Sequence, residues 1–250
     1  RTLYEAVKAV PEKFGITPGV DYPIIISFTS ADQDLSIQVH PTDDYAKTHE
    51  NTLYGKSESW YFIEPPSEGW IYADSLIEDK KEIKRSILNG DYESVVGKRI
   101  VTKNDLVYIP SGTLHALTRG ALVYEIQQST DITYRFFDYN RLDNDGKLRD
   151  LHLEDALDTL NTANRVKSSA FPKDTLISEQ PYTMVRKTLE NVYHNTTDVA
   201  VAITVSKGSM CVDGHSILTG MSILVLPNET ISISQAAEEV VIATPKLYFK

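Results

Sequence analysis

Four side chains in three short stretches of the sequence are of the types that bind divalent metal ions. They are, in chain order, Gln38, His40, Glu58 and His115. Two imidazoles, one carboxylate and one amide oxygen suit Zn²⁺, with a coordination position left open for water or a substrate. Each residue taken alone has an ordinary structural explanation, but together the four predict a metal centre.

The stretch Leu35–Pro41, with the sequence LSIQVHP, is the element expected to position the first two ligands. Its aliphatic residues alternate with Ser36, Gln38 and His40, which is the period of a half-buried strand. A polar row that faces the inside of a barrel needs a partner such as a metal ion or a polar substrate. The alternative is an edge strand whose polar face meets water.

A second expected strand carries Glu58, Trp60 and Phe62 on one face, so that the carboxylate lies at one end of an apolar face. The alternative for Glu58 is a surface carboxylate paired with Lys56, a type of pair that contributes little to stability. His115 ends the turn P-S-G-T-L-H, in which the glycine permits a tight bend before the next strand.

A third group consists of Arg135 and Glu125, each on a strand rich in aromatic and β-branched residues. An inward arginine could stabilise negative charge that develops on a substrate oxygen. Its structural alternative is an ion pair with Glu125 or Asp138. Glu125 could itself be a base with a shifted pKa, or the partner of Arg135.

The chain as a whole alternates many short β-rich segments with turns, which is typical of a barrel or sandwich. Residues 74–97 have helical spacing and form a small insertion, and residues 161–181 are a connector. We therefore expect two domains. Residues 1–165 form a metal-binding barrel that includes the insertion, and residues 166–250 form a second, metal-free barrel.

Composition excludes several classes of partner. The net charge of −10 argues against binding to nucleic acid or to an anionic membrane surface. No apolar run is long enough to span a membrane, and the first ten residues lack the apolar core of a secretion signal. Cys211 is the single cysteine, so neither an internal disulfide nor a multi-thiolate metal site can form. We expect a cytoplasmic protein with a small-molecule partner.

Four motifs in this order resemble those of the type I phosphomannose isomerases, which are cupin-superfamily enzymes. The motifs are LSIQVHP from Leu35, GKSESWY from Gly55, IPSGTLH from Ile109 and EIQQSTDITYR from Glu125. The resemblance implies a mainly β fold of two cupin-like (jelly-roll) β-barrels with a small helical insertion. It also implies interconversion of mannose 6-phosphate and fructose 6-phosphate through an enediol.

The resemblance assigns roles to individual residues. It implies zinc held by the four candidate ligands and Arg135 as the catalytic arginine. Lys56 matches a lysine that lines the active site, Ser36 matches a serine associated with the phosphate end of the sugar, and Glu125 is a candidate for the base.

Three departures from the family pattern favour an alternative, a non-catalytic cupin that retains the metal and binds a sugar as a sensor or regulator. Family members carry roughly fifty further residues before the position of Arg1, so we expect part of the first barrel to be absent from this chain. Ser27 stands where lysine is usual, and Ser30 where aspartate is usual. A metal-free structural barrel would leave the inward histidines unexplained.

Overall fold

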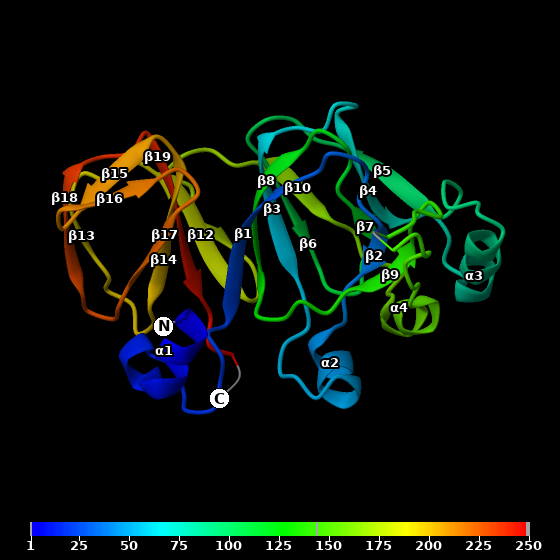
Figure 1. Ribbon diagram of the computed structural model, residues 1–250, viewed down its shortest axis with the longest axis horizontal. Helices are drawn as coiled ribbons and strands as arrows, with labels where there is room; N and C mark the ends of the chain where they lie inside the picture. Colours follow the sequence, from blue (N-terminus) through cyan, green and yellow to red (C-terminus); the bar gives the residue numbers. More distant parts are fainter. Residues whose placement is uncertain (1, 144, 249–250) are drawn as a thin grey trace. The chain divides into compact units, whose positions relative to one another are not determined.

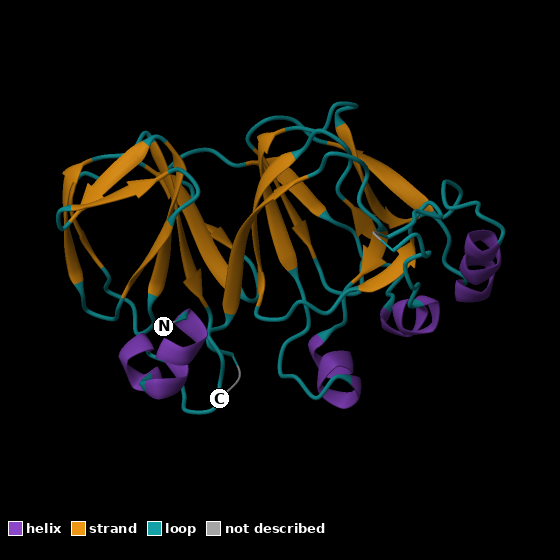
Figure 2. Cartoon of the chain, in the orientation of Figure 1, coloured by secondary structure: helices purple, strands orange, loops and turns teal. Residues whose placement is uncertain are grey.

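The computed structural model describes residues 2–143 and 145–248 and divides into two compact units (Figure 1). The larger unit is Ile25–Ala170. The smaller unit consists of the described residues up to Ile24 and from Phe171 onward. Strands predominate in both units (Figure 2), which confirms the mainly β prediction.

This division differs from the expected boundaries at both ends. Residues up to 24, which we assigned to the first domain, belong to the smaller unit. Their contacts explain the difference, because the Tyr22 hydroxyl donates to the Ala200 carbonyl at 2.8 Å and the Ala200 N–H donates to the Phe14 carbonyl at 2.9 Å. At the other end, residues 167–170 were assigned to the second domain, but they form a strand of the larger unit.

Two five-stranded sheets with antiparallel pairing form the larger unit. The first sheet contains, in spatial order, β1 (Ile24–Ser30), β8 (Leu122–Gln128), β3 (Glu58–Glu64), β6 (Asp105–Ile109) and β10 (Lys167–Ala170). The second sheet contains β5 (Val96–Ile100), β4 (Trp70–Ser75), β7 (His115–Ala116), β2 (Ile37–Val39) and β9 (Tyr134–Phe137). An apolar cluster that includes Phe62, Val107 and Ile71 joins strands of both sheets.

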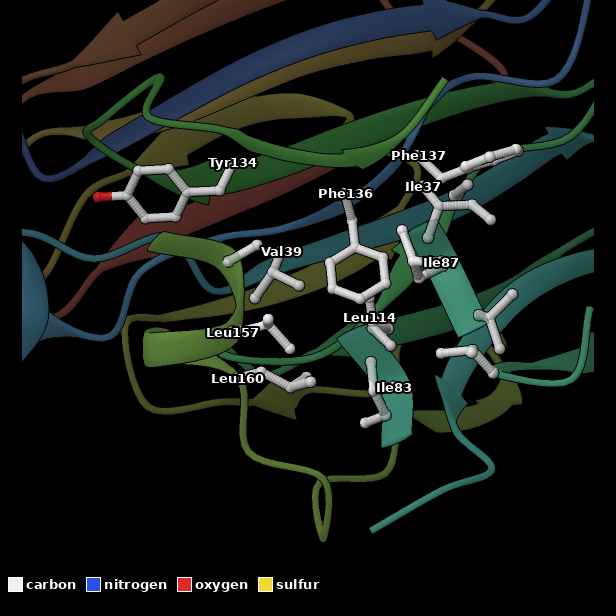
Figure 3. Close-up of a cluster of buried hydrophobic side chains, with 14 of the residues drawn as sticks. Ile37, Val39, Ile83, Ile87, Leu114, Tyr134, Phe136, Phe137, Leu157 and Leu160 are labelled. Carbon is white, nitrogen blue, oxygen red and sulfur yellow. The ribbon is translucent and has the colours of Figure 1, made fainter. Parts of the chain in front are cut away.

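Helices cover the outer face of the second sheet. Ile83 and Ile87 of α3 (Lys80–Leu88) and Leu157 of α4 (Leu153–Thr159) pack in a buried cluster with residues of β2 and β9 (Figure 3). The aliphatic row of β2, Ile37 and Val39, lies in this cluster. Because side chains alternate along a strand, Gln38 lies on the opposite face, towards the first sheet.

This arrangement decides between the alternatives for Leu35–Pro41. Ser36 and His40 are buried, with 7% and 1% of their surface exposed, so the polar row does not face water. One detail of the pattern is wrong. Leu35 does not share the face of Ile37, because the regular strand begins only at Ile37 and Leu35 packs against the cluster between the sheets.

The segment Asp43–Leu53 is polar and has no apolar stripe, yet Asp43–His49 forms helix α2. The hydroxyl of Thr42 caps this helix by accepting a hydrogen bond from the Tyr45 N–H. Acidic residues in the first turn and basic residues in the last turn complement the helix dipole. Capping and charge placement, rather than an apolar stripe, were the signals in the sequence.

The smaller unit contains α1 (Leu3–Ala9), a 3₁₀ turn at Pro11–Phe14 and two sheets. One sheet contains β11 (Ile177–Ser178), β12 (Tyr182–Lys187), β19 (Glu239–Pro245), β14 (Val201–Lys207) and β17 (Ser222–Val225). The other contains β13 (Asn191–His194), β18 (Thr230–Gln235), β15 (Ser209–Val212) and β16 (His215–Leu218). His194 and His215 are exposed, and His215 follows the Asp213-Gly214 hairpin turn. None of the described helices has the length and apolarity to cross a membrane.

Replacing Phe136 by alanine tests the contribution of the outer cluster. Phe136 is fully buried on β9, so Phe136→Ala should lower the free energy of unfolding by about 3–5 kcal/mol, through lost transfer energy and a cavity. Urea unfolding monitored by circular dichroism measures the change. The control Ile100→Ala removes a side chain that is 78% exposed and should change stability by less than about 0.5 kcal/mol. Equal effects of the two variants would contradict this account of the cluster.

Candidate metal centre

Three predicted ligands from different strands meet between the two sheets of the larger unit. His40 follows β2, Glu58 begins β3 and His115 begins β7. His40 Nε2 lies 3.4 Å from Glu58 Oε2, and His115 Nε2 lies 3.3 Å from Glu58 Oε1. All three side chains are buried, and their possible ligand atoms lie within 4.8 Å of one another. The structure therefore brings together residues that are up to 75 positions apart in the chain.

Backbone carbonyls orient both imidazoles. The Ile132 carbonyl lies 3.0 Å from His40 Nδ1, and the Thr113 carbonyl lies 2.8 Å from His115 Nδ1. Because a carbonyl only accepts hydrogen bonds, each Nδ1 carries a proton, and in the neutral form of such a ring the lone pair is on Nε2. Burial lowers the pKa of His40 to about 4, which keeps its ring neutral. Nε2 is thus the atom of each ring that a metal ion would bind.

The bonding of these atoms fits a divalent cation. Among the described residues, His40 Nε2 and both Glu58 oxygens are buried and have no hydrogen-bond partner. Burial opposes ionisation of Glu58, but the charge of Lys56 outweighs it and holds the pKa of the carboxyl well below its usual range. A buried carboxylate with unsatisfied oxygens beside two imidazole lone pairs is a site that a cation would stabilise.

Gln38, the fourth predicted ligand, is next to this group. It lies opposite His115 in the pairing of β2 with β7, and its Nε2 is 3.3 Å from His115 Nε2. In this orientation the amide donates to the imidazole lone pair. Turning the amide about its last torsion would present the oxygen instead, as metal ligation requires.

Lys56 and Glu125 lie beside the metal group. Lys56 Nζ is 3.4 Å from Glu58 Oε2 and 3.9 Å from Glu125 Oε1. Glu125 Oε2 accepts a hydrogen bond of 2.8 Å from the Thr29 hydroxyl. Burial, reinforced by the charge of Glu58, raises the pKa of Glu125 to about 7. A carboxyl with this pKa can exchange a proton near neutral pH.

Thr29 was not singled out in the sequence, although the strand pattern of residues 23–30 contained a signal for it. Alternation places Ser27 and Thr29 on one face of β1, and their hydroxyl oxygens are 3.4 Å apart. The bond from Thr29 to Glu125 shows that this face points to the site.

Arg135 lies opposite Gln38 in the pairing of β2 with β9. Its Nη1 donates to the Asp150 carbonyl at 2.8 Å, and its Nε is buried without a partner among the described residues. The alternative of an ion pair with Glu125 or Asp138 is wrong, since Glu125 pairs with Lys56, and Asp138 pairs with Arg141 and Arg149. Part of the guanidinium therefore has no partner in the part of the chain that the structure describes.

The segment that bears Lys56 and Glu58 approaches the end of β2 closely at Gly55. A Cβ atom on Gly55 would lie 2.4 Å from the Pro41 carbonyl oxygen, which no side chain could accommodate. The Lys56 N–H donates to that same carbonyl at 3.0 Å. Glycine at this position therefore lets the two ligand-bearing segments lie side by side.

Gln128 and Asp43 brace this segment from the other side. Asp43 Oδ1 accepts hydrogen bonds of 2.8 Å from both the Gly55 N–H and the Gln128 amide. Gln128 Oε1 in turn accepts from the Ser57 N–H at 2.7 Å. The brace links α2, β8 and the ligand segment, and neither residue was predicted from the sequence.

The ligand role of Glu58 is tested by the isosteric change Glu58→Gln. Since a neutral amide cannot compensate the charge of a divalent ion, the affinity for Zn²⁺ should fall by at least about 100-fold. Titration calorimetry on protein stripped with chelator measures this affinity. Glu125→Gln is the control, because Glu125 lies outside the ligand group and its variant should retain the ion. Unchanged affinity in Glu58→Gln would contradict the assignment.

The brace is tested by Gln128→Leu, which leaves the buried Ser57 N–H without this acceptor. The free energy of unfolding should fall by about 1–3 kcal/mol. Zn²⁺ affinity should fall roughly tenfold, because Glu58 loses part of its support. Gln33→Leu, at an exposed position of the same unit, should change neither quantity. Loss of stability with intact Zn²⁺ affinity would limit Gln128 to a role in stability.

Comparison with known proteins was made for sequence and for structure. No protein-family model matches the chain. A probable mannose-6-phosphate isomerase of Bacillus subtilis (strain 168) is 42% identical over 160 residues, which are 64% of this chain and 51% of that protein. A mannose-6-phosphate isomerase of Streptococcus mutans is 38% identical over 149 residues, which are 60% of this chain and 47% of that protein. The chain thus matches about half the length of these curated relatives.

Solved structures resemble the fold of this chain over nearly its whole length. The crystal structure of mannose 6-phosphate isomerase from Bacillus subtilis matches with a TM-score of 0.80 and 27% identity, covering 98% of this chain and 82% of that one. A putative mannosephosphate isomerase from Archaeoglobus fulgidus, with a TM-score of 0.73 and 17% identity, covers 97% and 79% and supports the fold. The chain is therefore similar in sequence and in its cupin-type fold to the mannose-6-phosphate isomerases, as the motifs indicated.

Proposed function

We propose that the chain carries the active site of an aldose–ketose isomerase that interconverts mannose 6-phosphate and fructose 6-phosphate. The observation that carries this proposal is the buried group of His40, Glu58 and His115, with a lysine and a second carboxylate beside it. The names of the relatives in the matched region support the substrate.

The residues that would hold the metal are His40, Glu58 and His115, with Gln38 supplying an amide oxygen. Nitrogen and oxygen donors of this kind favour Zn²⁺. When bound, the ion would orient and polarise sugar oxygens as a Lewis acid. The neutral ring of His40 and the ionised Glu58 already have the protonation states that such binding needs.

Glu125 is the proposed base that moves a proton between C1 and C2 of the open-chain sugar through an enediol. Thr29 holds one of its oxygens, so the other oxygen, which faces Lys56, remains available for the proton. Lys56 is placed to donate a proton to the ring oxygen as the sugar ring opens. Its Nζ lies 3.4 Å from Glu58 Oε2 and 3.9 Å from Glu125 Oε1.

Arg135 is the proposed cation that stabilises the enediolate, because its Nε–H has no partner among the described residues. Ser36, buried two residues before Gln38, is the proposed contact for the phosphate end of the sugar. In this assignment ring opening, proton transfer and charge stabilisation each belong to a different side chain.

The alternative proposal is a cupin that binds metal and sugar as a sensor without turnover. Ser27 favours it, because its hydroxyl lies on the inner face of β1 where the resemblance places a lysine. Without that cation, recognition of the phosphate would depend on the remaining side chains.

A coupled assay that reduces NADP⁺ as fructose 6-phosphate is converted onward distinguishes these proposals. With Zn²⁺ bound, we expect turnover of mannose 6-phosphate, and a decrease in kcat of about 10²–10⁴-fold in Glu125→Gln with Zn²⁺ affinity retained. Ser30→Ala, at an exposed position of β1, is the control and should leave kcat unchanged. Sugar binding without turnover by the wild-type protein would reject the isomerase and favour the sensor.

A further inference from the structure

We propose that Trp60 is a further ligand-contacting residue of this site, and that its indole N–H donates a hydrogen bond to an oxygen atom of the bound sugar. The inference rests on the proposed function only for the class of ligand, a sugar. It concerns binding, so it does not depend on whether the sugar is turned over.

The position of Trp60 in the sheet brings it to the metal group. Trp60 is two residues after Glu58 on β3, so both side chains lie on the same face, which points between the sheets. In the pairing of β3 with β8, Trp60 lies directly opposite Glu125. Side chains at opposite positions in an antiparallel pair are neighbours. Trp60 is thus a neighbour of Glu125, the proposed base, across the strand pair, and of Glu58, a candidate metal ligand, along β3.

The ring of Trp60 also contacts a second candidate ligand. Its centroid lies 5.6 Å from that of His115, with the planes at 68° to each other. On its other side, Trp60 belongs to the apolar cluster that includes Phe62 and Val107. The indole therefore lies at the boundary between the polar end of the interior and the apolar core.

The indole N–H has no acceptor at this boundary. Trp60 is 3% exposed, and its Nε1 has no hydrogen-bond partner among the described residues. Buried polar groups are nearly always paired, so a persistent unpaired N–H indicates a partner that binds there. A phenylalanine could fill the apolar space without this cost. What distinguishes tryptophan at this position is the donor.

The chemistry of the donor defines the atom that it would contact. An indole N–H only donates, so its partner must be an acceptor, such as a sugar hydroxyl or ring oxygen. Glu58 and Glu125 share its face, yet neither carboxylate accepts from it. A ligand with oxygens on several carbons, held at the metal group, would supply the acceptor that the protein lacks.

The test compares Trp60→Phe with Trp70→Phe, the other tryptophan of the chain. Trp70 is partly exposed, and its ring is covered by the Lys98 ammonium at 4.1 Å. Titration calorimetry of mannose 6-phosphate with Zn²⁺-loaded protein should show affinity weakened by about 5–30-fold in Trp60→Phe, the loss of a buried hydrogen bond. Zn²⁺ affinity should be unchanged in Trp60→Phe, and sugar affinity should be unchanged in Trp70→Phe.

A second measurement uses the Trp70→Phe variant, in which Trp60 is the remaining tryptophan. Binding of mannose 6-phosphate should shift its emission. Monodeoxy analogues of the sugar phosphate then identify the contact, because removing the bonded hydroxyl should weaken binding to the wild type and not to Trp60→Phe.

Each outcome decides the proposal. Equal sugar affinity in the wild type and Trp60→Phe, together with unchanged emission, would overturn it and indicate an N–H bonded to a water molecule. If the wild type does not bind the sugar, both the Trp60 contact and the assignment of a sugar as the ligand are rejected. Sugar binding that depends on Trp60 without turnover would uphold it while rejecting the isomerase.

Discussion

The structure of the larger unit depends on the compensation of one buried charge, the carboxylate of Glu58. Two imidazoles and the Lys56 ammonium surround it within 3.4 Å, yet none forms a hydrogen bond to either oxygen. Burying an ionised carboxylate is costly unless it is paired or coordinated to a metal. The buried negative charge that destabilises the metal-free site therefore favours the binding of a divalent cation.

The two faces of the second sheet have different tasks. Ile37 and Val39 anchor β2 beneath α3 and α4, while the polar row of the same strand faces the first sheet. Rigid packing on one side thus holds the ligands on the other. The brace of Asp43 and Gln128 extends this support to Glu58, so each ligand-bearing segment is fixed by contacts outside the ligand group itself.

Two predictions from the sequence were wrong, one because only the apolar pattern was weighed and one because charged groups share partners in the fold. Residues 43–49 are polar and lack an apolar stripe, but a cap and well-placed charges make them helical. The sequence offered Arg135 two carboxylates as partners, Asp138 and Glu125. In the fold Asp138 pairs with Arg141 and Arg149. Glu125 instead contacts Lys56 and Thr29. Competition among charges for partners is a property of three-dimensional arrangement.

The sequence by itself determined the mainly β architecture, the alternating faces of β2 and β3, and the identity of the candidate ligands, because side-chain period and donor chemistry are local properties. Only the tertiary structure decided which of those side chains meet, that residues up to 24 join the smaller unit, and that Gln128 and Thr29 support the site. It also decided that the Trp60 N–H has no hydrogen-bond partner among the described residues. These outcomes depend on contacts between residues far apart in the chain, which no local pattern encodes.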